Sequence, residues 1–124
     1  MSRDISISFY PAGSDRSTST SIEVRPPYYL FGTQNTSKRF WSISKLKELG
    51  IVHLTELGDT DPIFFVGWEM IADLGKEIML LEQHLESIDF EPEVKAQWIS
   101  HLVYCYHLLV QTAPKDSVPQ MMIG

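Results

Sequence analysis

The chain has 124 residues, a net charge of −6 and a hydrophobic fraction of 44%. That length and composition are typical of one soluble globular domain spanning residues 1–124, and they argue against a disordered chain. No apolar run approaches the ~20 residues needed to cross a bilayer, and the alternating N-terminus does not resemble a secretory signal. We therefore expect a cytoplasmic protein without a membrane partner. Because Cys105 is the only cysteine, an intrachain disulfide is excluded.

The negative charge is concentrated in one part of the chain. Residues 36–50 carry four basic side chains against one carboxylate, whereas residues 51–93 carry eleven carboxylates against Lys76 alone, a local charge of −10. A net negative chain is a poor nucleic-acid binder, because phosphate contacts need a dominant positive field. We expect the basic segment to compensate the acidic one within the molecule.

Alternation of apolar and polar residues predicts β-strands near the N-terminus. Residues 5–9 alternate with a period of two, and residues 14–21 form a polar loop rich in serine and threonine. A second strand is expected at residues 22–24, at a sheet edge, because Pro26 and Pro27 cannot donate hydrogen bonds to a ladder. The aromatic stretch at residues 28–31 could add a short third strand.

Helical periodicity dominates the middle of the chain. An apolar stripe predicts a helix from about Lys38 to Leu49, with possible N-caps at residues 35–37 and Gly50 after its end. Residues 51–57 could form a short strand or an extended connection. Residues 63–66 are rich in residues that favour strands, and could be either a strand or the start of the next helix.

Two long helices are predicted in the second half. The first begins between Pro62 and Trp68 and ends near Ser87; the second follows the acidic residues 89–93 and is stopped by Pro114. Their short connection favours an antiparallel hairpin. The first helix has apolar positions at alternating steps of three and four: Ile71, Leu74, Ile78, Leu81, Leu85 and Ile88.

The expected fold class is α+β. A small antiparallel sheet, made mainly of N-terminal strands and possibly of a C-terminal strand at residues 118–123, would pack on three helices. The last two of these helices would form the antiparallel hairpin.

Nothing in the sequence predicts a catalytic, cofactor-binding or metal-binding site. His101 and Cys105 are four residues apart on a helix, but Cys105 falls on the apolar line of that helix, so a buried structural cysteine is the favoured interpretation. The histidines have no metal-binding spacing, and glycine loops for phosphate are absent from the sequence. The close pairs Glu69–Asp73 and Asp73–Glu77 are expected on a solvated helix face rather than in a catalytic cleft.

The acidic helix face is the feature with the clearest functional implication. Like-charged residues four apart destabilise a helix slightly, and this helix has only Lys76 to offset them. Selection for solubility alone could explain this bias. The alternative is a face that attracts a basic protein partner, which an exposed tryptophan can anchor. The predicted partner-binding residues are Trp68, Glu69, Asp73, Glu77, Glu82 and Glu86.

A non-enzymatic binding module for a basic protein is therefore the leading hypothesis. In its composition, as a small acidic α+β protein without catalytic motifs, the chain resembles bacterial immunity proteins that neutralise basic toxins, which implies an inhibitor of the immunity or antitoxin kind.

Two other functions remain open. A small-molecule binder or enzyme could have a pocket between the sheet and the helical hairpin, lined by Tyr28, Tyr29, Trp41, Trp98, Tyr104 and Tyr106. A structural homodimer could form through the apolar residues Phe64, Phe65, Met70 and Met79.

Overall fold

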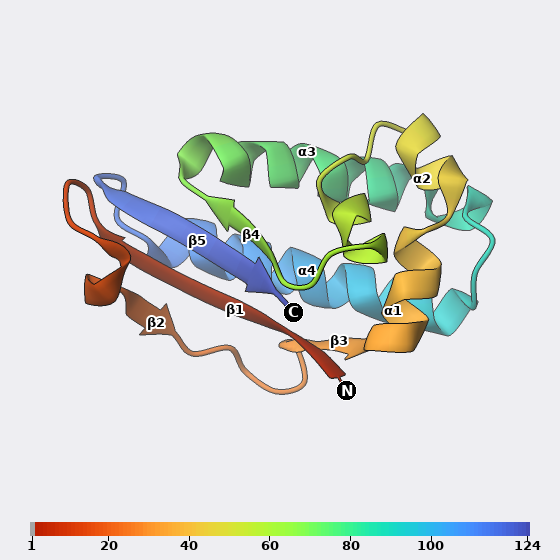
Figure 1. Ribbon diagram of the computed structural model, residues 1–124, viewed down its shortest axis with the longest axis horizontal. Coiled ribbons are helices and arrows are strands. Elements are labelled where there is room, and N and C mark those ends of the chain that lie inside the picture. The colour runs from red at the N-terminus through yellow and green to blue at the C-terminus, as the bar shows by residue number, and fades with distance from the viewer. Residues whose placement is uncertain (1) are drawn as a thin grey trace.

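The computed structural model describes residues 2–124 and contains a five-stranded antiparallel sheet (Figure 1). The strands are β1 (Ser2–Pro11), β2 (Thr20–Ile22), β3 (Leu30–Thr33), β4 (Ile63–Val66) and β5 (Ser117–Ile123). The spatial order is β2-β1-β5-β4, and β3 pairs with the start of β1. The predicted C-terminal strand is thus confirmed, and it lies inside the sheet between β1 and β4.

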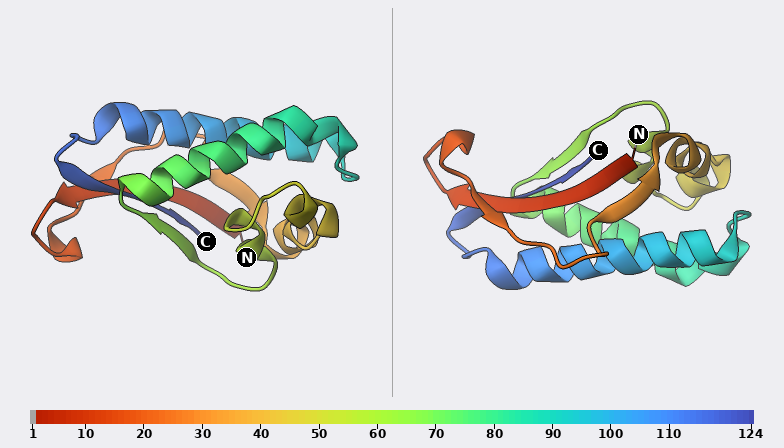
Figure 2. Two further views of the ribbon diagram at one scale, coloured as in Figure 1. Left: turned by 90° about the horizontal axis from the view of Figure 1, so that it is seen from above. Right: turned by 90° about the horizontal axis from the view of Figure 1, so that it is seen from below.

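Alternation along the strands decides which side chains enter the core. Ile5 and Ile7 of β1, Met121 and Ile123 of β5, and Phe65 of β4 are buried on the inner face. Their chain neighbours point to the opposite face, as the period of two requires. The helices α3 (Trp68–His84) and α4 (Pro92–Thr112) cover the inner face (Figure 2), so the predicted α+β fold class is confirmed.

The helix predicted over residues 38–49 is wrong in its bounds and its continuity. The chain forms α1 (Gln34–Trp41) and α2 (Ser44–Glu48), so the structure has four helices instead of three. Thr33 is the N-cap of α1 and accepts a hydrogen bond from the Thr36 amide at 3.2 Å. The extended backbone of Ile43 (ψ 119°) divides the two helices.

The two ambiguous segments are now assigned. Residues 51–57, expected as a strand or an extended connection, instead contain the 3₁₀ turn η2 (Leu54–Gly58). Residues 63–66 are strand β4, and Gly67, at φ +92°, joins it directly to α3. A positive φ at this junction suits glycine, which has no Cβ to clash with the backbone.

The predicted helical hairpin is confirmed. α3 ends in a 3₁₀ turn, η3 (Leu85–Ser87), and α4 begins at Pro92, whose fixed φ suits the first turn of a helix. The Lys95 side chain is buried, and its Nζ donates to the carbonyl oxygens of Leu85 and Ile88 at 2.7 and 2.6 Å. One lysine of α4 therefore satisfies orphan carbonyls at the end of α3.

Between residues 2 and 124, no helix combines the length and the apolar character needed to cross a membrane.

Candidate functional site

The six predicted partner-binding residues do not form one continuous surface. Trp68 and Glu69 lie in the first turn of α3, whereas Glu82 lies in its last turn and Glu86 in the turn η3. A helix of this length spans about 25 Å, at roughly 1.5 Å per residue. The two ends of α3 are therefore separate surfaces, and Asp73 between them is half-buried.

Glu77 is buried, which contradicts its predicted place on a solvated face. Its side chain is 4% exposed, and its two carboxylate oxygens accept hydrogen bonds from the backbone amides of His53 and Leu54, both at 3.0 Å. These amides begin the 3₁₀ turn η2, where the backbone has no internal acceptor for them. Glu77 therefore caps a distant turn and is not available to a partner.

Trp68 is held by the sheet. Its indole Nε1 donates to the carbonyl oxygen of Ser117 at 2.9 Å, and the ring is half-buried. Together with Val110 and Lys115 it lines a shallow hollow of about 340 Å³. This hollow belongs to the opposite end of α3 from Glu82, so Trp68 cannot anchor a partner bound there.

The tip of the α3–α4 hairpin carries the densest acidic surface. Five exposed carboxylates lie within twelve residues of chain: Glu82, Glu86, Asp89, Glu91 and Glu93. We call them the tip carboxylates. Over residues 2–124, none of the five forms an ion pair with a lysine or arginine, since Arg3–Asp61 is the one such pair found there. Lys95 lies among them in sequence, but its ammonium group is buried against backbone carbonyls.

The predicted compensation by the basic segment does not occur through direct contacts. Within the described part of the chain, Lys38, Arg39, Lys45 and Lys47 form no ion pair with any carboxylate. The guanidinium group of Arg39 instead stacks on the ring of Phe90, 5.6 Å from its centroid. One cation therefore lies beside the tip carboxylates without neutralising them.

A groove between α3 and α4 is lined in part by Glu82, one of the tip carboxylates. It has a volume of about 370 Å³, and most of its lining is apolar, from α4 and from Leu85 of η3. A second hollow, of about 420 Å³, continues around residues 82–87, and Glu82 belongs to both. The groove is lined by Glu82, Leu85, Ala96, Ile99, Ser100 and Val103. An apolar centre with a polar rim is the usual composition of a protein-binding surface.

Cys105 and His101 make structural contacts. The Cys105 thiol donates to the carbonyl oxygen of Tyr28 at 3.3 Å, and His101 Nδ1 lies 2.7 Å from the carbonyl oxygen of Leu30. Burial raises the pKa of the Cys105 thiol to about 12, so the nucleophilic thiolate is disfavoured. No group of three or more potential ligands is positioned for a metal ion in residues 2–124.

We expect the Cys105 thiol to be unreactive in the folded protein. With a pKa of about 12, roughly one thiol in ten thousand is ionised at pH 8. Iodoacetamide at pH 8 should therefore label the native chain far more slowly than the chain in denaturant, as followed by intact mass. Equal labelling rates in the two states would contradict the buried thiol.

The aromatic residues considered for a pocket pack against one another. Trp41 and Trp98 are buried with Phe31 and Phe40, and Tyr28 stacks on Tyr104 with the ring centroids 4.0 Å apart. These rings therefore contact other aromatic side chains of the protein.

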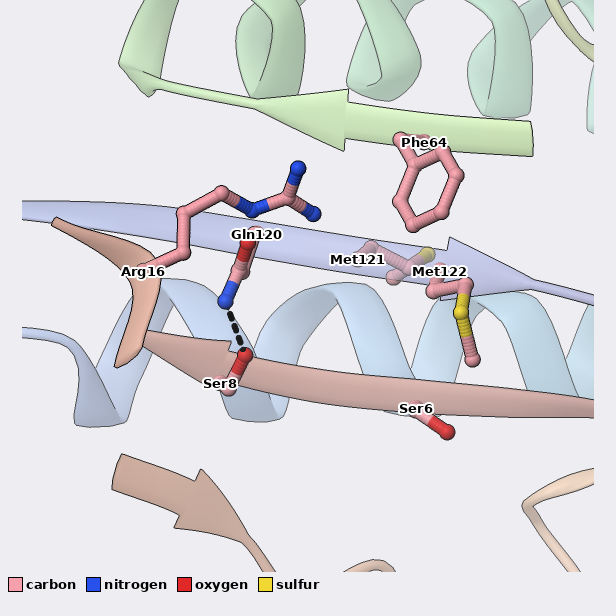
Figure 3. A pocket seen from close by; sticks show the side chains of 7 residues that line it. All are labelled: Ser6, Ser8, Arg16, Phe64, Gln120, Met121 and Met122. Atoms are coloured by element: carbon pink, nitrogen blue, oxygen red, sulfur yellow. Dashed lines mark hydrogen bonds between the residues drawn. The ribbon is translucent and has the colours of Figure 1, made fainter. Parts of the chain in front are cut away.

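The apolar residues considered for a homodimer are distributed over three environments. Phe65 is buried in the core, which contradicts its proposed place in an interface, whereas Met79 is exposed on α3. Phe64 is exposed on the sheet face away from the helices. There it borders a hollow of about 140 Å³ beneath Arg16, whose guanidinium carbon lies 5.2 Å from the ring centroid (Figure 3).

No family model matches this sequence, and neither a curated protein nor a solved structure is detectably similar to it.

Proposed function

We propose that this protein is a non-enzymatic binding module that holds a basic protein partner in the groove between α3 and α4. The observation that carries the proposal is the set of tip carboxylates, which are exposed and lack lysine or arginine partners within residues 2–124. One of them, Glu82, lines the mainly apolar groove, and Glu86 lines the hollow beside it. An inhibitor of a basic toxin or of a nucleic-acid enzyme, of the immunity or antitoxin kind, is the concrete form of this function.

Charge and apolar area have separate roles in this proposal. Exposed charges contribute little to the stability of a chain when they are unpaired, but complementary charge accelerates encounter and disfavours wrong partners. The apolar floor formed by Leu85, Ile99 and Val103 would supply the contacts that slow dissociation. A partner that presents lysines or arginines around an apolar ridge fits both parts.

Capture of partners with matched charge variants tests the proposal. Wild-type protein, the variant Glu82→Lys/Glu86→Lys, and the control Glu23→Lys/Asp116→Lys would be immobilised and exposed to lysate of the source organism. All four residues are exposed, and both variants change the net charge equally. We expect a basic protein that is retained by the wild type and the control, lost from the Glu82→Lys/Glu86→Lys variant, and released by salt. Retention of the same proteins by all three would contradict the proposal.

A further inference from the structure

Arg3 is a buried cation with unused hydrogen-bonding capacity. It lies on β1 on the inner face of the sheet, and its side chain is 3% exposed. Nη1 donates to the hydroxyl of Ser37 at 2.9 Å, and Nε lies 3.9 Å from the Asp61 carboxylate, too far for a hydrogen bond. Over residues 2–124, Ser37 is the one hydrogen-bond acceptor for a guanidinium group with five N–H donors.

Unused donors on a buried charge are costly unless another group accepts from them. Transferring an ion out of water is compensated only when its hydrogen bonds are remade inside the protein. The buried Nε of Arg3 has no acceptor within residues 2–124, although the side chain lines a hollow of about 180 Å³. The structure therefore places an incompletely satisfied cation at the wall of a space open to a small molecule.

The other walls of this hollow carry both signs of charge. Gln34, Asn35 and Lys38 come from the first two turns of α1, and residues 59–61 come from the loop before β4. The start of a helix favours anions, because its first amide groups have no partners within the helix. Two carboxylates also line the hollow: Asp59 is exposed, and Asp61 lies 3.9 Å from Arg3 Nε and accepts a hydrogen bond from the Gln34 side-chain amide at 2.6 Å.

We propose that this hollow, lined by Arg3, Lys38 and the start of α1 and by Asp59 and Asp61, binds a small zwitterion of the α-amino acid type. The hollow contains two cationic and two anionic side chains, so its net formal charge is zero. A simple anion would meet repulsion from both aspartates, and a simple cation would meet repulsion from Arg3 and Lys38. A molecule with both charges can place each one beside its opposite.

The assignment of atoms follows from the chemistry of each wall. The α-carboxylate would accept from the Nη N–H groups of Arg3 that Ser37 leaves free, because a hydrogen bond between a guanidinium group and a carboxylate is charge-assisted. Lys38 and the first amides of α1 would add further donors. The α-ammonium group would donate to Asp59 at the exposed rim, while Asp61 keeps its hydrogen bond with Gln34. This site is independent of the groove between α3 and α4.

Titration followed by ¹H–¹⁵N correlation spectra of the intact protein tests the assignment. Glycine, alanine and serine would be added separately, and acetate and methylammonium would serve as probes that carry only one of the two charges. We expect at least one amino acid to shift the Arg3 Nε–H and the Gln34 and Asn35 amide signals in a saturable manner. Each single-charge probe should bind about tenfold more weakly or worse.

Variants on the exposed rim provide a test that leaves the buried arginine in place. Lys38→Gln and Asp59→Asn should each weaken amino-acid binding about threefold or more, whereas the control Lys45→Gln on α2 should leave it unchanged. Acetate binding as tightly as the amino acids would overturn the zwitterion assignment in favour of a plain anion site. The absence of any saturable shift at Arg3 would overturn the site itself, without bearing on the proposed protein partner.

Discussion

Replacing Gly32 by alanine will lower the free energy of unfolding by about 2–5 kcal/mol, which is the largest effect we expect from a single methyl group in this chain. Gly32 has φ +82°, a conformation that L-residues adopt only with strain. An added Cβ would also overlap the ring of Trp98, approaching its Cε2 atom to 2.8 Å. Because Trp98 is 4% exposed and packs on Phe31 and Phe40, the ring has little room to move.

Chemical denaturation of Gly32→Ala and Gly13→Ala separates the cost of the strained backbone from the cost of overlap with the Trp98 ring. Gly13 has a similar φ of +86°, but a Cβ added there would meet no atom within 4 Å. Gly13→Ala should therefore lose only the backbone term, about 1–2 kcal/mol. If both variants lost the same stability, the contact between Gly32 and Trp98 would be energetically unimportant, and our account of the core around this ring would be wrong.

Replacing Glu77 by alanine will lower the free energy of unfolding by about 2–4 kcal/mol. The substitution leaves the amides of His53 and Leu54 without an acceptor, and the Leu54 side chain is fully buried. A buried unsatisfied amide costs about 1–3 kcal/mol, and hydrogen bonds to a charged group are stronger than neutral ones. Urea denaturation of the variant and the wild type measures the loss directly.

Glu69→Ala is the matched control for Glu77→Ala. Glu69 lies on the same helix, carries the same charge and is exposed, so its loss should change stability by less than about 0.5 kcal/mol. Equal effects at the two positions would place Glu77 on the solvated face after all. The burial of Glu77 also has a practical consequence: charge reversal there would bury an unpaired lysine and destabilise the fold, so it cannot serve as a test of partner binding.

The sequence was sufficient for the parts of the fold that depend on periodicity. Period-two alternation predicts β1, the apolar character of residues 118–123 predicts β5, and the spacing of apolar residues together with Pro92 and Pro114 predicts α3 and α4. These elements are long enough that many residues carry the same signal. The pairing of β5 between β1 and β4 was not predictable, since it depends on contacts between segments more than fifty residues apart.

The errors occurred where a few long-range contacts determine the structure. Ile43 has an extended backbone within a stretch of good helical spacing, so two short helices replace the single predicted one. Glu77 has the same spacing from Asp73 as an exposed acidic pair would have, yet it satisfies two amides that lie more than twenty residues earlier. Periodicity reports the face of a helix and not the polar groups that another segment brings to that face.

The candidate site was only partly accessible from the sequence. Glu82 and Glu86 were identified by charge alone, and the acidic residues before α4 were interpreted as features of a helix start. These carboxylates lie near one another, and Glu82 lines a groove with Ile99 and Val103, only because α3 and α4 pack antiparallel. Arg3 is not among the predicted site residues, although the period of two places it on the same face of β1 as Ile5 and Ile7.

The most direct test of the central claim is the dissociation constant of the captured basic partner for two variants at two salt concentrations. If the partner binds in the groove, Glu82→Lys/Glu86→Lys should raise the dissociation constant at least about tenfold above the wild-type value at low salt. The difference between this variant and the wild type should be smaller at high salt. The control Glu23→Lys/Asp116→Lys should change the dissociation constant less than about twofold. Equal weakening in both variants would show that only net charge matters, and unchanged affinity in the first would show that the partner binds elsewhere. Either result would contradict the assignment of the groove between α3 and α4 as the binding surface.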